Sequence, residues 1–280
     1  MNMKPFYSPC EINKNHAHAE GLTALFLFNE NQGNSCRNLI EDENNISLSN
    51  TSWVDLGIES NSNGEIGTID NTNQIVNSDC GTIILKFKSN VSFNDGLNHF
   101  LFGQLGVSNN VGDFYLFKNG VDLYFLLYDA TTFHYVILKT SKVPNWETGT
   151  QITLQWDRNQ SIFNSDNMVF NIDGEYATPD LSGGETSWST FTVNSSLSIL
   201  NDLLNPTWFA NGCIEYLNIY NKIVDVNILK DIYQDPYAMV YKPNYLSNFI
   251  GAYAPQLLPT TMDKRHKHFG ANALPLGIGL

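Results

Sequence analysis

The alternation of apolar and polar residues with a period of two is the feature that most constrains how this chain folds. Residues 81–88, Gly-Thr-Ile-Ile-Leu-Lys-Phe-Lys, have the pattern of a β-strand. Pairs such as Asn119-Gly120 and Asp173-Gly174 close hairpins, because these residue types tolerate a positive φ. The sequence therefore predicts an antiparallel β-sandwich or barrel. We expect strands at residues 81–88, 97–103, 113–119, 122–129, 134–140, 151–157, 167–172, 197–200 and 213–220.

One segment near the end of this β-rich region has helical periodicity instead. Val226, Leu229 and Ile232 recur every three residues, and Asp225 precedes them as an N-cap residue. An Asp-Pro pair then ends the segment. The sequence predicts one substantial helix, near residues 225–234.

Composition limits the classes of protein to which the chain can belong. Hydrophobic residues make up 42% of the 280 residues, and aromatic residues make up 12%, which is enough for a large core. The net charge of −13 argues against binding of nucleic acid phosphates. No apolar stretch is long enough for a transmembrane helix, and residues 1–19 lack the apolar centre of a signal peptide. We therefore expect synthesis in the cytoplasm, with no nucleic acid and no membrane as partner.

The two ends of the chain differ from the region between them. Prolines interrupt every candidate element after Tyr241, and the last ten residues are apolar and rich in glycine. Such a tail cannot bury itself alone, so we expect it to lie along another subunit. The predicted organisation is an N-terminal arm at 1–19, a β-sandwich at 20–240 and a C-terminal extended arm at 241–280.

Sequences near both ends of the predicted sandwich resemble a known family. Residues 16–34 are His-Ala-His-Ala-Glu-Gly-Leu-Thr-Ala-Leu-Phe-Leu-Phe-Asn-Glu-Asn-Gln-Gly-Asn. They resemble the opening of LamG-like, concanavalin A-like jelly-roll domains of the kind found in tailed-phage structural proteins. Residues 210–221 look like the closing strand of that family, and residues 233–238 look like its final motif. The resemblance implies a two-sheet jelly roll over residues 16–240.

The resemblance leaves three functions open, because this fold carries several. The first is a virion protein on the capsid surface or on a tail or fibre appendage, located in the virion and anchored by its arms. Its partners would be other virion proteins and further copies of itself. The second is a carbohydrate-binding module that attaches to host-surface glycans. The third is a glycosidase or depolymerase. Binding to a glycan array would separate the second function from the first.

Catalytic motifs do not support the third function. Glycoside hydrolysis needs paired carboxylates across a sugar-binding cleft, and no Glu-x-Asp-x-Glu pattern places such a pair on one strand face. Motifs for nucleophiles and for nucleotide binding are also missing from the sequence. The four cysteines form no Cys-x-x-Cys pair, and we expect them to be free thiols. We therefore predict a non-enzymatic protein with no catalytic residues.

Three tryptophans are candidates for stacking on sugar rings. Trp146, Trp188 and Trp208 lie in loop-like segments, each beside an amide or hydroxyl side chain. Lectin sites combine an aromatic ring with such polar groups. The alternative is that these large rings close the ends of the sandwich core.

The sequence predicts no cofactor and no metal site. Calcium is the alternative, because Asp129, Asp157, Asp173 and Asp202 all fall at strand ends, where loop oxygens can bind it. Asp173 is most simply part of a hairpin turn. His16 and His18 would share one face of a strand, a spacing that metals use, but no third ligand is near them in sequence.

The C-terminal arm supplies a prediction about assembly. Lys264, Arg265 and Lys267 would contact an acidic surface, and Leu274 and Leu276 would supply apolar contacts. Surface ion pairs contribute only about 0–1 kcal/mol each, so the apolar residues must provide most of the attachment.

A chain that ends at Lys242 is therefore expected to fold as a soluble monomer and to fail to join virus particles. Size-exclusion chromatography and incorporation into particles are the measurements. If the shortened chain incorporates as well as the full chain, the arm is not an anchor.

Overall fold

The computed structural model describes a β-rich unit in detail. The chain divides into one compact unit, Met1–Lys242, and a second, Pro243–Leu280. Only the first unit contains described residues, so the fold reported is that of this unit. The described residues are 10–54, 57–104, 112–129, 132–164, 166–183, 188, 196–202 and 207–241.

Two large antiparallel sheets form the sandwich of the described residues. We call the nine-stranded sheet the front sheet. Every adjacent pair of its strands is antiparallel, and β9 and β10 carry a bulge next to Phe117. In spatial order the front sheet consists of β16 (Leu181–Gly183), β12 (Phe133–Lys139), β11 (Asp122–Tyr128), β10 (Phe114–Asn119), β9 (His99–Gln104), β17 (Ser196–Ile199), β7 (Ile66–Asp70), β4 (Ile46–Ser49) and β3 (Ser35–Cys36).

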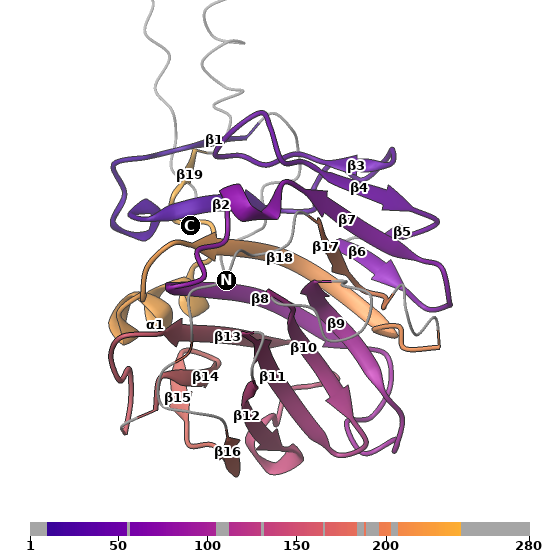
Figure 1. Cartoon of the computed structure of the whole chain (residues 1–280). Helices are drawn as coiled ribbons and strands as arrows, with labels where there is room; N and C mark the ends of the chain where they lie inside the picture. Colours follow the sequence, from indigo (N-terminus) through magenta and orange to yellow (C-terminus); the bar gives the residue numbers. More distant parts are fainter. Residues whose placement is uncertain are drawn as a thin grey trace, which may run out of the picture. The chain divides into compact units, whose positions relative to one another are not determined.

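The second sheet, which we call the back sheet, has eight strands. Figure 1 shows three of its strands, β8, β13 and β18, lying above β9 to β12 of the front sheet. The back sheet consists of β15 (Glu175–Ala177), β14 (Met168–Ile172), β13 (Thr150–Asp157), β8 (Cys80–Ser89), β18 (Gly212–Tyr220), β6 (Gly57–Ser60) and β5 (Ser52–Val54), with β2 (Leu22–Phe26) also paired to β18.

The two stretches that resemble the jelly-roll family lie side by side. β2 comes from the opening stretch and β18 from the closing one, and Leu217 of β18 pairs with Phe26 of β2. Just outside the sandwich, β1 (Glu11–Ile12) pairs with β19 (Val240–Tyr241), so the two ends of the described unit also meet. The two stretches that resemble the family are therefore neighbouring strands of the back sheet.

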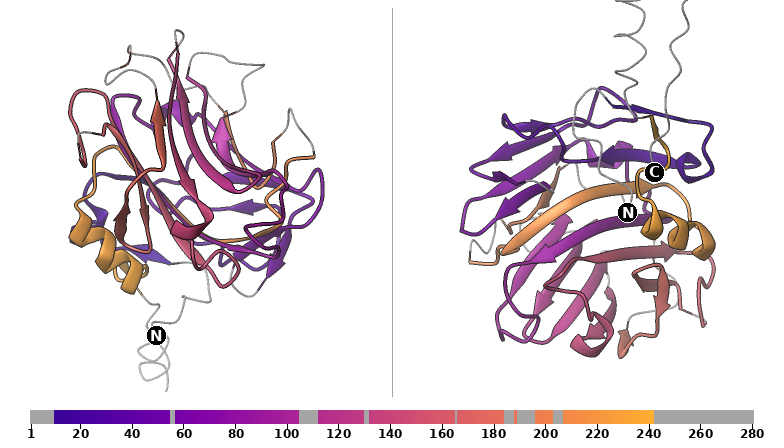
Figure 2. Two further views of the ribbon diagram at one scale, coloured as in Figure 1. Left: turned by 90° about the horizontal axis from the view of Figure 1, so that it is seen from below. Right: turned by 180° about the vertical axis from the view of Figure 1, so that it is seen from behind.

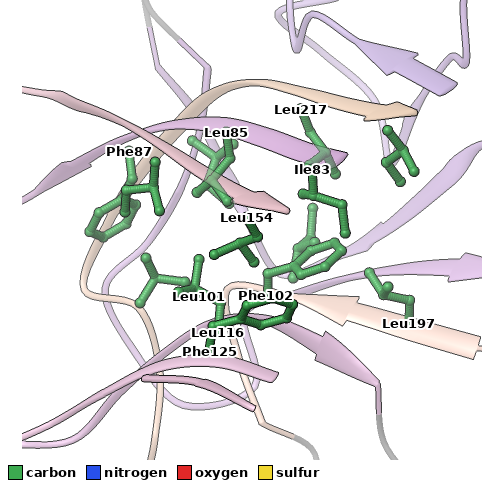
Figure 3. Close-up of a cluster of buried hydrophobic side chains, with 14 of the residues drawn as sticks. Ile83, Leu85, Phe87, Leu101, Phe102, Leu116, Phe125, Leu154, Leu197 and Leu217 are labelled. Atoms are coloured by element: carbon green, nitrogen blue, oxygen red, sulfur yellow. The ribbon is translucent and has the colours of Figure 1, made fainter. Parts of the chain in front are cut away.

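The core lies between the sheets because alternate side chains of each strand point inward. Figure 3 shows Ile83, Leu85 and Phe87 of β8 facing Leu116 and Phe125 of the front sheet. All of these side chains are fully buried. This packing accounts for the period-two pattern in the sequence.

A helix covers part of the outer face of the back sheet. α1 (Val226–Gln234) begins after Asp225, whose carboxylate accepts a hydrogen bond from the Asn227 amide at 2.8 Å. Leu229 and Ile232 are fully buried in a second cluster with Ile84 of β8. Figure 2 shows α1 at one side of the sandwich. Three short 3-10 helices complete the described elements: η1 (Ala17–Ala19), η2 (Thr72–Gln74) and η3 (Thr140–Lys142).

The predicted all-β sandwich with one substantial helix is confirmed among the described residues. Each of the expected strands overlaps an observed one, and the helix and its N-cap match the prediction. One local expectation was wrong, because residues 17–19 form η1 and not a strand. His16 caps this turn and accepts a hydrogen bond from the His18 amide. Nowhere in the described residues is there a helix of the length and apolarity needed to cross a bilayer.

Truncation of a core leucine tests the packing between the sheets. Leu85→Ala removes a fully buried side chain and leaves a cavity, so it should lower the free energy of unfolding by about 2–5 kcal/mol. The matched control is Leu181→Ala at the sheet edge, where the side chain is 54% exposed and the effect should stay within about 0.5 kcal/mol. Denaturant titration measures both. Equal effects would contradict this assignment of the core.

Candidate functional site

The structure places the predicted stacking residues in different environments. Trp146 is only 2% exposed, and its ring packs against Phe87 and Phe93, with centroids 4.9 and 4.7 Å away. Trp188 is 5% exposed, and its ring lies 5.2 Å from the His134 ring. Because neither ring faces solvent, the interpretation of residues 146 and 188 as exposed loop aromatics is corrected. The alternative, that a large ring belongs to the sandwich core, describes Trp146 and Trp188, which both lie in the main core cluster.

Trp208 is half-buried and belongs to a row of stacked rings. Its ring lies 5.9 Å from that of Phe117 on β10, at an interplanar angle of 21°. Phe117 in turn stacks on Tyr124 of β11 at 5.0 Å and 11°. The paired register of these strands brings Phe117 directly opposite Tyr124. Strand pairing therefore builds a platform to which Trp208 adds from a separate segment.

This row is part of a larger apolar surface on the outer side of the front sheet. The inward residues of β10, β11 and β12 fill the core, so the alternate residues point outward. Ile137 is buried, and Asn119, Asp122 and Lys139 are polar, but the other outward residues are large, mostly apolar and half-buried. We call this surface the aromatic face; it consists of Tyr115, Phe117, Tyr124, Leu126, Tyr128, Phe133, Tyr135 and Trp208.

Tyr135 has a second arrangement suited to stacking. A Cβ atom at position 183 would lie 2.3 Å from Cζ of Tyr135, so the ring rests directly on the backbone of Gly183. The two residues are paired across β12 and β16. Because Gly183 has no side chain, the tyrosine ring can lie directly over the edge strand at this point.

Polar side chains border the aromatic face along one edge. Asn119, Asp122 and Lys139 are directly paired across β10, β11 and β12, next to the row that contains Phe117 and Tyr124. We call these three residues the polar row. Burial raises the pKa of the Tyr124 phenol, and the nearby charge of Asp122 adds to that rise. The polar row thus places an amide, a carboxylate and an ammonium group beside the platform of rings.

A charged cluster lies beneath the same strand, on its inner side. Lys118 is fully buried, and its ammonium group donates to Asp95 Oδ1 at 2.5 Å and to the Leu97 carbonyl at 2.8 Å. His99 is 3% exposed and lies between Asp95 Oδ2, at 2.6 Å, and the Phe209 carbonyl, at 3.0 Å. We call Asp95, His99 and Lys118 the charged cluster.

The ionisation of Asp95 follows from these contacts. Burial alone would raise the pKa of this carboxyl group, but hydrogen bonds from Lys118, the Leu97 amide and His99 lower it below its ordinary value of 3.8. The carboxylate is therefore ionised at neutral pH. Its stabilising effect is present above the unfolded-state pKa and is lost as the pH falls through the lower folded-state pKa.

Three of the four aspartates that are candidate calcium ligands accept hydrogen bonds from nearby groups of the chain. Asp173 accepts hydrogen bonds from the Asn145 side chain at 2.6 Å and the Gln151 amide at 2.8 Å. Asp157 accepts from the amides of two following residues, and Asp129 accepts from the Thr132 amide. The charge of Asp202 acts on the phenol of Tyr115. Within the described part of the chain, no three histidine, cysteine or acidic side chains gather to hold a metal ion.

The predicted assembly residues cannot be placed. Lys264, Arg265, Lys267, Leu274 and Leu276 all lie outside the described residues. Their role in anchoring the chain stays a prediction. The four cysteines are described: Cys10, Cys36 and Cys213 are buried, and Cys80 is half-buried.

Comparison with known proteins gives similarity of fold but no family. No family model and no curated protein match the sequence. Solved structures of similar fold include a botulinum neurotoxin serotype D ligand-binding domain in complex with N-acetylneuraminic acid, at 12% identity and a TM-score of 0.61. A botulinum neurotoxin DC binding domain in complex with SialylT is 11% identical, with a TM-score of 0.57.

The matches cover only part of the neurotoxin chains, and this limits what the comparisons show. The matches cover 80% and 78% of this chain but only 53% and 52% of the neurotoxin chains, so this chain spans about half of their length. At such low identity the likeness shows the fold alone. The sandwich is therefore of a kind that occurs in binding domains of larger proteins.

The charged cluster should matter for stability. Asp95→Ala leaves a buried ammonium group and His99 without their carboxylate, and it should lower the free energy of unfolding by about 3–5 kcal/mol near neutral pH. The matched control is Asp42→Ala, because Asp42 is 83% exposed and pairs with Arg37 at 2.6 Å. That surface pair should contribute about 0–1 kcal/mol. Equal losses by denaturant titration would contradict a structural role for the cluster.

Proposed function

We propose that this chain is a non-catalytic carbohydrate-binding β-sandwich and that its aromatic face is the glycan site. The observation that carries the proposal is the combination of stacked rings and the polar row on one side of the front sheet. Pyranose rings have apolar C–H faces that pack on aromatic rings, and hydroxyl groups at their edges that need hydrogen-bond partners. The aromatic face and the polar row offer both kinds of contact next to each other.

The names of the structural neighbours support the same class of ligand. Binding domains of similar fold have been solved with N-acetylneuraminic acid and with SialylT. Those ligands belong to the neurotoxins, and the shared fold makes a glycan ligand a reasonable proposal for this chain as well.

The site favours binding without hydrolysis. Glycosidases need two carboxyl groups about 5–9 Å apart on either side of the scissile bond. Asp122 is the carboxylate of the polar row, and Asp113, which accepts a hydrogen bond from the Tyr115 hydroxyl at 2.9 Å, is fully buried. Since a buried carboxylate cannot reach a bound sugar, we propose that the chain is not an enzyme.

A phage virion location is the second part of the proposal. Its support is the resemblance of residues 16–34 and 210–221 to jelly-roll domains of tailed-phage structural proteins. In that setting the module would sit on the capsid or on a tail appendage, with other virion proteins and further copies of itself as partners. Labelling of particles with an antibody against the sandwich, viewed by electron microscopy, tests the location.

Alanine substitutions in the aromatic face test glycan binding. Trp208→Ala and Tyr135→Ala each remove a ring that would stack on a sugar, and each should weaken binding at least about tenfold, equivalent to about 1.4 kcal/mol. The matched control is Tyr241→Ala, because this tyrosine is 54% exposed on β19, outside the aromatic face. Binding to a glycan array is the measurement.

Two results would overturn this assignment. The first is wild-type protein that binds no glycan on an array of sialylated and neutral sugars. The second is glycan binding that Tyr241→Ala weakens as much as Trp208→Ala does. Turnover of a polysaccharide by purified protein would overturn the non-catalytic part.

A further inference from the structure

We propose that the aromatic face binds a linear chain of several sugar units, which lies diagonally across β10, β11 and β12. This inference rests on the proposed function, because it names the class of glycan that the same site takes. It is carried by two separate groups of aromatic rings on one continuous surface. We call Phe117, Tyr124 and Trp208 the first ring group, and Tyr128 and Phe133 the second ring group.

The second ring group is built by strand pairing, as the first one is. Tyr128 at the end of β11 is directly opposite Phe133 at the start of β12. Their ring centroids are 4.6 Å apart, and their planes are 37° apart. Both side chains are half-buried and point outward, on the same face as Tyr124. The aromatic face therefore has two places at which a sugar ring can stack.

The two ring groups are too far apart for a single sugar to contact both. Tyr124 and Tyr128 are four residues apart on β11, which corresponds to about 14 Å along an antiparallel strand. Phe117 and Phe133 are also two strands apart, which corresponds to about 10 Å across the sheet. A single pyranose ring is shorter than either distance, so it can stack on one group only. A chain of several units can contact both groups at once.

The surface between the two ring groups is apolar. Leu126 lies between them on the outward face of β11, and it pairs with Tyr115 of β10 and Tyr135 of β12. The Tyr115 hydroxyl donates to Asp113 at 2.9 Å, and the Tyr135 ring rests on Gly183, so both tyrosines are held by partners other than Leu126. A sugar chain that crosses from one ring group to the other can therefore pack its C–H faces on apolar side chains along its whole path.

The polar row lies next to the first ring group and away from the second. Asp122 is two residues from Tyr124 on β11 but six residues from Tyr128. A short glycan should therefore bind at the first ring group, where stacking and hydrogen bonds are available together. The second ring group contributes further stacking once the chain is long enough to reach it.

A second copy of this chain is the other occupant that an apolar sheet face could take. The centres of interfaces between proteins are depleted in charged residues. Here Asp122 and Lys139 are paired in the row directly beside Tyr124. A ligand with many hydroxyl groups satisfies a carboxylate and an ammonium group beside a ring, so the face favours a glycan over an identical sheet face.

A series of glycans of increasing length tests the inference. Wild-type protein is titrated by calorimetry with cello-, malto- and chito-oligosaccharides and with oligosialic acids, each from the monomer to the hexamer. In a series that binds, the affinity should rise at least about tenfold from the dimer to the longer chains, because only these contact both ring groups. It should then level off once the chain spans the face.

Two substitutions separate the contributions of the ring groups. Phe133→Leu removes a ring of the second group but keeps an apolar side chain, and it should weaken binding of the hexamer at least about fivefold while leaving the dimer unchanged. Trp208→Ala should weaken binding at every length. The matched control is Tyr241→Ala, which lies outside the aromatic face and should change neither.

Each outcome decides between the inference and the function beneath it. Equal affinity for dimer and hexamer, or a Phe133→Leu effect that is the same for both, overturns the inference and leaves glycan binding intact. Size-exclusion chromatography that shows a wild-type dimer, which Phe133→Leu dissociates, makes the face an interface between copies and also overturns it. The absence of binding in every series overturns the proposed function itself. If Phe133→Leu does not fold, the length dependence of wild-type binding still decides.

Discussion

The opposite orientation of Phe117 and Lys118 on β10 is the constraint on which the candidate site depends. Successive side chains on a strand point to opposite faces, so the ring lies on the outer surface and the ammonium group lies beneath it. A fully buried cation has to be neutralised, and Asp95 does this while also binding His99. The contact that neutralises Lys118 therefore positions Asp95. Asp95 in turn contacts His99, and His99 contacts the segment that carries Trp208.

The sequence predicted the long strands and the helix because their signals are local. β8 and β13 are each long enough for the alternating pattern to repeat several times. Asp225 is next to the helix that it caps. Strands such as β1 and β3 have only two residues, which is too short for a period to show. These strands form because a strand distant in sequence supplies their hydrogen bonds, and the local sequence does not indicate that partner.

The candidate site could be predicted only in part. Residue type alone pointed to Trp208, but it pointed equally to Trp146, which lies in the core. Trp146 is buried because it packs on Phe87 and Phe93, which are distant from it in sequence. One signal of the aromatic face was present in the sequence. Residues 114–117 are Phe-Tyr-Leu-Phe, so both faces of this strand carry large apolar or aromatic side chains. In a strand with one solvated face, apolar and polar residues alternate instead. The charged cluster was invisible, because Asp95, His99 and Lys118 meet only through tertiary structure.

The geometry of the aromatic face also bears on how the two parts of the proposed function fit together. A sheet surface makes a shallow site, which contacts a sugar on one side only and so yields modest affinity for a single glycan. Linked sites overcome this limit, since each bound copy raises the effective concentration of the next. A module displayed in many copies on a particle would gain avidity without a deeper pocket. Weak intrinsic binding and a repeated display would therefore be complementary.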